Sequence, residues 1–232
     1  MTTLADNITL ARLAIAPVAV LSYLALPIDG GTAFFICAIL CGVAEITDWL
    51  DGKVARARKE VSDFGKLADP FCDVFYRMAV MLAAVLPAGL VGLSVAEPTN
   101  PLWQTPTYAS LGSEGALILG TGIFPFLPVL LMVLREIVAG ALRAMCASKG
   151  LVLAARTSGK VKAWFQGFTL ISSLGVAALF GEHMDAVRWY AFVLCWLCAA
   201  FSVLSMVEYL WANRTTLAQL TAAKPPAADE DG

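Results

Sequence analysis

Long apolar runs separated by short polar connections dominate this chain of 232 residues. About 20 apolar residues in a helix cross a bilayer core, which is about 30 Å thick. Most runs show no polar face repeating at the helical period, which argues against amphipathic surface helices. The pattern predicts six transmembrane helices, near 8–28, 32–52, 70–95, 116–146, 162–182 and 187–212. We expect Pro125 and Pro128 to kink the fourth helix.

Composition supports a membrane protein over a soluble domain. Hydrophobic residues make up 59% of the chain and charged residues only 15%, and the mean hydropathy is +0.75. We predict one all-α transmembrane domain over 1–213 and a cytoplasmic tail over 214–232, disordered from about 224. The first residues lack the basic region and the cleavage site of a secretory signal, so the first span stays in the mature protein.

The basic residues predict the orientation. One group of six surrounds the second connection, another surrounds the fourth, and the long third connection has none: Lys53, Arg56, Arg58, Lys59, Lys66, Arg77; Arg135, Arg143, Lys149, Arg156, Lys160, Lys162. By the positive-inside rule, the second and fourth connections and both termini are cytoplasmic. A multi-pass protein of the plasma (inner) membrane is expected.

Carboxylates gather around the second connection, where the segment from Thr47 to Val74 holds five aspartates in 28 residues. On helices, Asp48 and Asp51 share one face, and Asp69 and Asp73 share another. If the two helices are neighbours, four carboxylates converge at the membrane edge, where mutual repulsion favours a bound cation. Oxygen ligands suit Mg²⁺, Mn²⁺ or Ca²⁺, and two ions are possible.

Small residues and an arginine lie between these carboxylates. Gly52 and Gly65 leave two positions in the wall of the predicted carboxylate site without side chains. Ala55 and Arg56 lie one turn beyond Asp51. Metal, small residues and arginine together indicate a diphosphate site, in which cations neutralise oxygens during phosphoryl transfer.

The motif Asp48-Trp-Leu-Asp51-Gly52-Lys-Val-Ala55-Arg56, followed after eight residues by Gly65 and then by Asp69 and Asp73, resembles the signature of the CDP-alcohol phosphotransferase family. The resemblance implies six transmembrane helices, a homodimer, and Mg²⁺- or Mn²⁺-dependent transfer from a CDP-linked donor to an alcohol, with release of CMP. It makes Asp48, Asp51 and Asp69 metal ligands, and Asp73 both a ligand candidate and the general base. Residues framing the CDP group would be Gly52, Ala55, Arg56, Gly65 and Asn7.

The second half of the chain is similar to phosphatidylglycerophosphate synthases within that family, as is the opening, Asn7-Ile-Thr9 with Arg12 and Pro17. This similarity implies that CDP-diacylglycerol and glycerol 3-phosphate are the substrates. A basic pocket would capture the acceptor's phosphate. Its candidates are Arg135, Arg143, Lys160 and Lys162; each could instead be an ordinary positive-inside residue. Membrane lipid is an expected partner and nucleic acid is not.

Departures from the subfamily keep other acceptors open. The stretch around the last two aspartates commonly resembles DPxADK, whereas Cys72 and Val74 replace Ala and Lys here. Inositol phosphate is a live alternative acceptor, and serine or phosphatidylglycerol are weaker ones. Two more distant alternatives are an intramembrane prenyltransferase, which needs two separate Asp-rich clusters, and a divalent-cation transporter, which places carboxylates near the bilayer midplane.

Several other residues are assigned to structure. Cys195 and Cys198 form a CxxC inside the apolar sixth span, where we expect packing. His183 is expected to have no catalytic role. Glu45 lies one turn before Asp48 and could be near the site, but it is interpreted as a helix-packing or hydrogen-bonding residue. Asp63 is placed in the solvated connection.

Overall fold

The computed structural model describes residues 4–24, 30–58, 63–86, 88, 122–151 and 157–221. All regular secondary structure in these ranges is helical. The long helices are α1 (Leu4–Leu24), α2 (Gly30–Arg58), α3 (Asp63–Ala83), α5 (Phe126–Ser148), α6 (Thr157–Leu179) and α7 (Met184–Ala212). The 3-10 turn η3 (Gly181–His183) precedes α7, and the short α8 (Arg214–Thr221) follows it.

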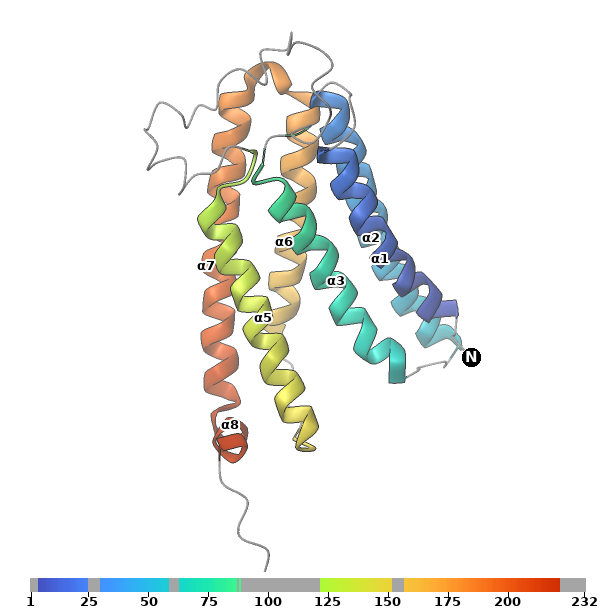
Figure 1. The fold of residues 1–232 in the computed structure, drawn as a ribbon, viewed down its shortest axis with the longest axis vertical. Helices are drawn as coiled ribbons and strands as arrows, with labels where there is room; N and C mark the ends of the chain where they lie inside the picture. Colours follow the sequence, from blue (N-terminus) through green and yellow to red (C-terminus); the bar gives the residue numbers. More distant parts are fainter. Residues whose placement is uncertain are drawn as a thin grey trace, which may run out of the picture.

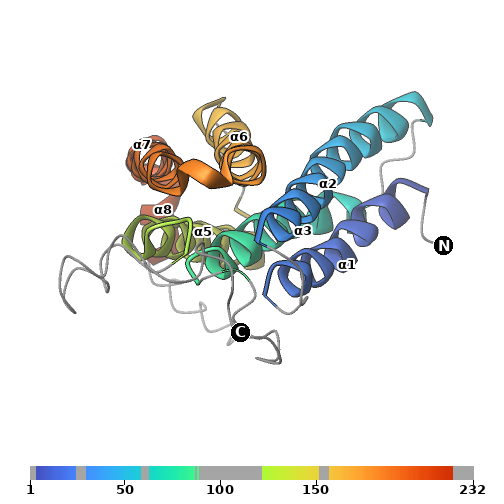
Figure 2. The same ribbon diagram turned by 90° about the horizontal axis from the view of Figure 1, so that it is seen from above.

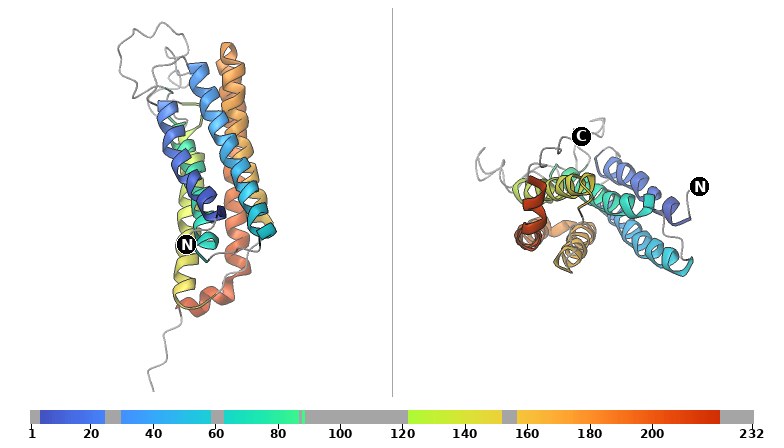
Figure 3. Two further views of the ribbon diagram at one scale, coloured as in Figure 1. Left: turned by 90° about the vertical axis from the view of Figure 1, so that its right-hand side faces the viewer. Right: turned by 90° about the horizontal axis from the view of Figure 1, so that it is seen from below.

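The six long helices form two rows of three (Figure 2). One row is α1, α3 and α5, and the other is α2, α6 and α7; α1 packs on α2, α5 packs on α7, and α3 also touches α6. Successive helices run in opposite directions along the bundle (Figure 1). The start of α1, the end of α2 and the start of α3 therefore lie at one end, which Figure 3 shows from the side and from below.

Buried side chains from the long helices fill the interior between the rows. Fully buried members include Tyr23, Met81, Met132, Leu170 and Cys195. Many large apolar side chains instead face outward: Leu21 is 59% exposed, Ile137 61% and Leu204 65%. An outward apolar surface of this kind suits lipid better than water.

Two helical segments are long and apolar enough to cross a membrane by length and composition, namely Gly31–Asp48 and Gly181–Ala212. Only 33% and 39% of these segments is buried, which is unlike the core helix of a soluble protein. A shorter apolar segment spans Leu10–Leu24. The all-helical prediction is confirmed for the described part of the chain, and the count of six spans remains a prediction.

The third and fourth helices differ from their predicted ranges. Helix α3 begins at Asp63 and ends at Ala83, whereas a span over 70–95 was expected. Asp63 is thus the first residue of α3, and its assignment to a connection was wrong. Beyond Ala83 a turn hydrogen-bonds to the segment before α5: Gly122 N donates to Val85 O at 2.7 Å, and Phe124 N donates to Ala84 O at 3.1 Å.

The prediction of a proline kink in the fourth helix was also wrong. Helix α5 begins at Phe126, after Pro125, whose φ of −70° and ψ of 140° are extended. Pro128 lies in the first turn, where backbone N–H groups have no helical acceptor and a missing donor costs little. Both prolines therefore mark the start of α5.

Helix α8 turns away from α7 at the lower end of the bundle (Figure 1). Asn213 joins the two helices: it is buried, and its side-chain nitrogen donates to Tyr209 O at 2.9 Å. Arg214 then stacks over the Trp211 ring at 4.6 Å from the centroid. The start of the predicted tail is thus helical; the predicted disordered end lies outside the described residues.

Candidate active site

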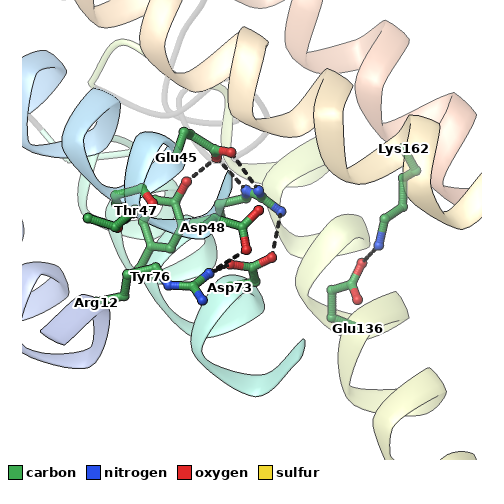
Figure 4. Close-up of polar contacts among 10 residues, drawn as sticks. Arg12, Glu45, Thr47, Asp48, Asp73, Tyr76, Glu136 and Lys162 are labelled. Atoms are coloured by element: carbon green, nitrogen blue, oxygen red, sulfur yellow. Dashed lines mark hydrogen bonds and ion pairs between the residues drawn. The ribbon is translucent and has the colours of Figure 1, made fainter. Parts of the chain in front are cut away.

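Arg12 joins two of the predicted carboxylates. Its Nη1 lies 2.7 Å from Asp48 Oδ1 on α2, and the same nitrogen contacts Asp73 Oδ1 on α3. The Arg12 side chain is completely buried, whereas those of Asp48 and Asp73 are 32% and 20% exposed. Figure 4 shows Arg12 reaching from α1 to both carboxylates.

Electrostatics explains this grouping. A buried guanidinium loses its hydration, and ionised partners with hydrogen bonds must compensate for that loss. Two carboxylates brought close together repel each other unless a positive charge lies with them. The guanidinium of Arg12 supplies that charge, so all three helices meet at one charged cluster.

A second ion pair lies beside the first. Arg77 grips Glu45 with two hydrogen bonds, from Nε to Oε1 at 2.7 Å and from Nη2 to Oε2 at 2.8 Å. The hydroxyl of Tyr76 also donates to Glu45 Oε1. Arg77 Nη1 lies 3.9 Å from Asp73 Oδ2, one helical turn earlier on α3. The interpretation of Glu45 as a helix-packing or hydrogen-bonding residue is confirmed.

A third charged group lies between α5 and α6, apart from the first two (Figure 4). Lys162 contacts Glu136, and Arg135 Nη1 lies 3.2 Å from both Glu136 oxygens. Arg135 Nη2 is 3.2 Å from Ser205 Oγ on α7. Arg143 is exposed, and its Nε lies 3.3 Å from Ala139 O on its own helix. The structure therefore brings Arg135 and Lys162 together around a carboxylate, with Arg143 two turns further along α5.

The other predicted site residues lie on α1, α2, α3 and α6, with side chains outside the described part of the structure. Asp51 is one turn beyond Asp48 on α2, and Asp69 is one turn before Asp73 on α3. The remaining members of this set are Gly52, Ala55 and Arg56 on α2, Gly65 on α3, Asn7 on α1 and Lys160 on α6. Their parts in the site remain predictions.

Among the side chains that the structure describes, no group of three or more His, Cys, Asp or Glu is placed to hold a metal ion. Those of Asp51 and Asp69 are outside that set. The structure does bring together one pair of predicted ligands, Asp48 and Asp73, around the guanidinium of Arg12. The four-carboxylate site remains a prediction.

Four charged residues of these clusters were not predicted as site residues: Arg12, Glu45, Arg77 and Glu136. A signal for Arg12 was present, because an ionisable residue inside an apolar span is a candidate functional residue with a partner to be found. Arg77, four residues after Asp73 within a predicted span, carried the same signal. Glu136 lies next to Arg135 in the sequence, and only the basic residues of that segment were interpreted as site residues.

The residues assigned to structure occupy ordinary places. Cys195 and Cys198 are free, buried and part of the apolar core, which confirms that they pack. His183 ends η3 and is exposed.

The sequence profile of the family described as CDP-alcohol phosphatidyltransferase matches residues 2–204 of the chain. The chain is also similar to proteins named CDP-diacylglycerol–glycerol-3-phosphate 3-phosphatidyltransferase. That of Bacillus subtilis is 30% identical over 224 residues, covering 92% of this chain and 96% of its own. That of Haemophilus influenzae is 26% identical over 210 residues, covering 90% and 92%. That of Sodalis glossinidius is 30% identical over 212 residues, covering 90% and 94%.

Proposed function

The chain belongs to the CDP-alcohol phosphatidyltransferase family, and from this premise we propose that it transfers a phosphatidyl group from CDP-diacylglycerol to glycerol 3-phosphate. The products are phosphatidylglycerophosphate, a phospholipid precursor, and CMP. The relatives named above match nearly the whole length of the chain. Their names state this activity. Acceptor-dependent release of CMP from CDP-diacylglycerol by the purified protein tests the activity.

The single observation that carries the proposal is the Arg12 bridge between Asp48 and Asp73. These are the first and last aspartates of the signature motif, and they come from different helices. Their meeting at one guanidinium brings the two halves of the motif together. A chance match of the motif in the sequence would not require Asp48 and Asp73 to meet in the folded protein.

The residues present fit a divalent cation, Mg²⁺ or Mn²⁺. Asp48 and Asp73 already share one positive charge, and Asp51 and Asp69 follow at one-turn spacing on the same two helices. These four carboxylates would hold the metal, since hard oxygen ligands suit such ions. A bound metal would polarise the diphosphate and stabilise the charge on the departing CMP.

The chain's own residues would carry the remaining chemistry. Asp73 accepts the proton of the acceptor's hydroxyl while that oxygen attacks the phosphorus bearing the diacylglycerol. The P–O bond to CMP breaks as the new P–O bond forms, so the phosphatidyl group moves without any net redox change. Gly52, Ala55, Arg56 and Gly65, together with Asn7, frame the CDP group of the donor.

Arg135, Arg143, Lys160 and Lys162 bind the acceptor's phosphate in this proposal. The Arg135–Glu136–Lys162 cluster supports it, because two cations share one buried carboxylate and keep a net positive charge. A doubly charged phosphate is a stronger partner for such cations than a neutral hydroxyl. Glycerol 3-phosphate offers that group, whereas serine and phosphatidylglycerol do not.

We further propose six spans in the plasma (inner) membrane, with the active site and both termini on the cytoplasmic side. The alternating helix directions support this, because they bring the end of α2, the start of α3, the end of α5 and the start of α6 to one end of the bundle (Figure 1). Most of the basic residues grouped around the second and fourth connections lie at these helix ends. A site at that end takes CDP-diacylglycerol from the surrounding lipid and the water-soluble acceptor from the cytoplasm. A homodimer is part of the same proposal.

A further inference from the structure

We propose that Glu45 and Arg77 are positioning residues of the transfer site, with Glu45 holding the Arg77 guanidinium beside the Asp73 carboxylate and preventing it from binding there. Neither residue belongs to the signature motif. The inference rests on the proposed role of Asp73 as the base.

The distances around Arg77 support this division of its nitrogens. Nε and Nη2 form short bonds to the two oxygens of Glu45, at 2.7 and 2.8 Å. Such two-pronged pairs are among the strongest hydrogen-bonded contacts in proteins. Nη1 is 3.9 Å from Asp73 Oδ2, too far for a hydrogen bond between these two atoms. Arg77 therefore lends charge near Asp73 while its directional bonds go to Glu45.

The charges form one chain across three helices: Asp48, Arg12, Asp73, Arg77 and Glu45 alternate in sign. Asp73 stands in the middle, in contact with Arg12 and in a longer ion pair, at 3.9 Å, with Arg77. Removing the charge of Glu45 would leave the Arg77 side chain, which is 4% exposed, with Asp73 as its remaining ion-pair partner among the described side chains. A buried guanidinium in that position would move onto Asp73.

Helix α6 sets the position of Glu45. An added Cβ at Gly167 would lie 2.5 Å from Glu45 Oε1, so the carboxylate fits only because residue 167 has no side chain. Tyr76 donates to the same oxygen from α3. Glu45 is thus held by two neighbouring helices, which fixes where Arg77 can lie.

Gly167→Ala tests the proposal without changing any charge. The new methyl group would displace the Glu45 carboxylate, which is the end of a flexible side chain, and alanine favours the helix by about 1 kcal/mol over glycine. Gly175→Ala on the same helix is the matched control, because a Cβ there meets nothing within 4 Å. We expect Gly167→Ala to lower kcat for CMP release about fivefold or more, with both KM values within about twofold. Both variants are assayed well below their melting temperatures, because displacing Glu45 also weakens a buried ion pair.

Glu45→Gln and the double variant Glu45→Gln/Arg77→Gln complete the test. The single variant should lower kcat by about tenfold or more and weaken Mn²⁺ binding, measured by electron paramagnetic resonance, because Arg77 then occupies Asp73. The double variant should recover much of both, since the displaced guanidinium is gone. A purely structural role would predict the reverse order, with the double variant the worst.

The outcomes separate this inference from the proposed activity. A wild type that releases no CMP with any acceptor overturns the activity. If the wild type is active but Gly167→Ala matches Gly175→Ala in kcat and Mn²⁺ affinity, the positioning role is wrong. The positioning role is also wrong if the double variant is no better than Glu45→Gln. Should Glu45→Gln fail to fold, Gly167→Ala still decides the question.

Discussion

Arg12 and Asp48 are 36 residues apart in the chain and are joined by a 2.7 Å ion pair between α1 and α2. The same Arg12 nitrogen contacts Asp73 on α3. The first helix, which lies outside the signature motif, therefore supplies the positive charge that holds the two ends of the motif together. Arg12 should matter for both the fold and the chemistry.

Arg12→Met should lower activity by at least about tenfold and destabilise the protein by about 3 kcal/mol, because two carboxylates lose their shared cation in a partly buried site. Thermal unfolding and CMP release in detergent measure the two effects. Arg214→Met, at an exposed position on α8, removes the same charge away from the site; it should leave activity unchanged and cost only the stacking on Trp211, about 0.5–1 kcal/mol. If Arg12→Met retains the CMP release and the thermal stability of Arg214→Met, the bridge contributes to neither activity nor stability.

Local patterns predicted the long helices and some of the charged residues that the structure brings together, such as Asp48 and Asp73. Apolar runs locate helices well because burying them in lipid requires length, and the i,i+3 and i,i+4 spacings place carboxylates on one face whatever the tertiary fold. Helix ends were less predictable, as at Ala83 and Phe126, because prolines and turn contacts such as Gly122 with Val85 decide them.

The pairings of charges could not be predicted. Glu45 and Arg77 are 32 residues apart, and Glu136 and Lys162 are 26 apart, so only the packing of helices decides that they meet. Sequence spacing shows which residues share one face of a helix, but not which residues of different helices meet. The signal that remained was the presence of Arg12, Glu45 and Arg77 within apolar spans, where an ionisable residue needs a partner.

Asp73→Asn separates proton transfer from binding. Asparagine keeps an oxygen that can accept from Arg12 but cannot take up the acceptor's proton. We expect CDP-diacylglycerol to bind with Mg²⁺ while kcat falls by about 10² or more. Glu182→Gln, at an exposed carboxylate in η3, is the control and should have wild-type kcat. Near-normal turnover by Asp73→Asn would mean that another group takes the proton.

Metal dependence can be tested by removal and by substitution. EDTA should abolish activity, and added Mg²⁺ or Mn²⁺ should restore it. Asp48→Asn, Asp51→Asn and Asp69→Asn should each lower activity by about a hundredfold or more, which corresponds to about 3 kcal/mol of transition-state stabilisation. Turnover in excess EDTA at the wild-type rate would refute the metal site.

The acceptor pocket predicts a different kinetic signature. Arg143→Ala should raise KM for glycerol 3-phosphate about tenfold, with little change in KM for CDP-diacylglycerol, because a lost phosphate contact weakens acceptor capture. Lys162→Ala should do the same and also lower stability, since Glu136 is buried and loses one of its two cations. Lys149→Ala, exposed at the end of α5, is the control. Unchanged KM values in both variants would show that these residues only set the orientation in the membrane and do not bind the acceptor.

Orientation can be read by labelling single introduced cysteines in intact and opened cells. Asp63→Cys should react with an impermeant maleimide only from the cytoplasmic side, and Thr105→Cys only from the other side. The six native cysteines are all buried and should contribute little background. Labelling in the opposite sense would place the site on the wrong face of the membrane.

The central claim, transfer of a phosphatidyl group to glycerol 3-phosphate, is tested most directly by an acceptor panel with purified protein, CDP-diacylglycerol and Mg²⁺. Radiolabelled glycerol 3-phosphate, inositol 1-phosphate, inositol, serine and phosphatidylglycerol are supplied separately, and lipid product and CMP are measured together. We predict one lipid product per CMP with glycerol 3-phosphate and background levels with the others. A labelled lipid formed with another acceptor and none with glycerol 3-phosphate would contradict the claim.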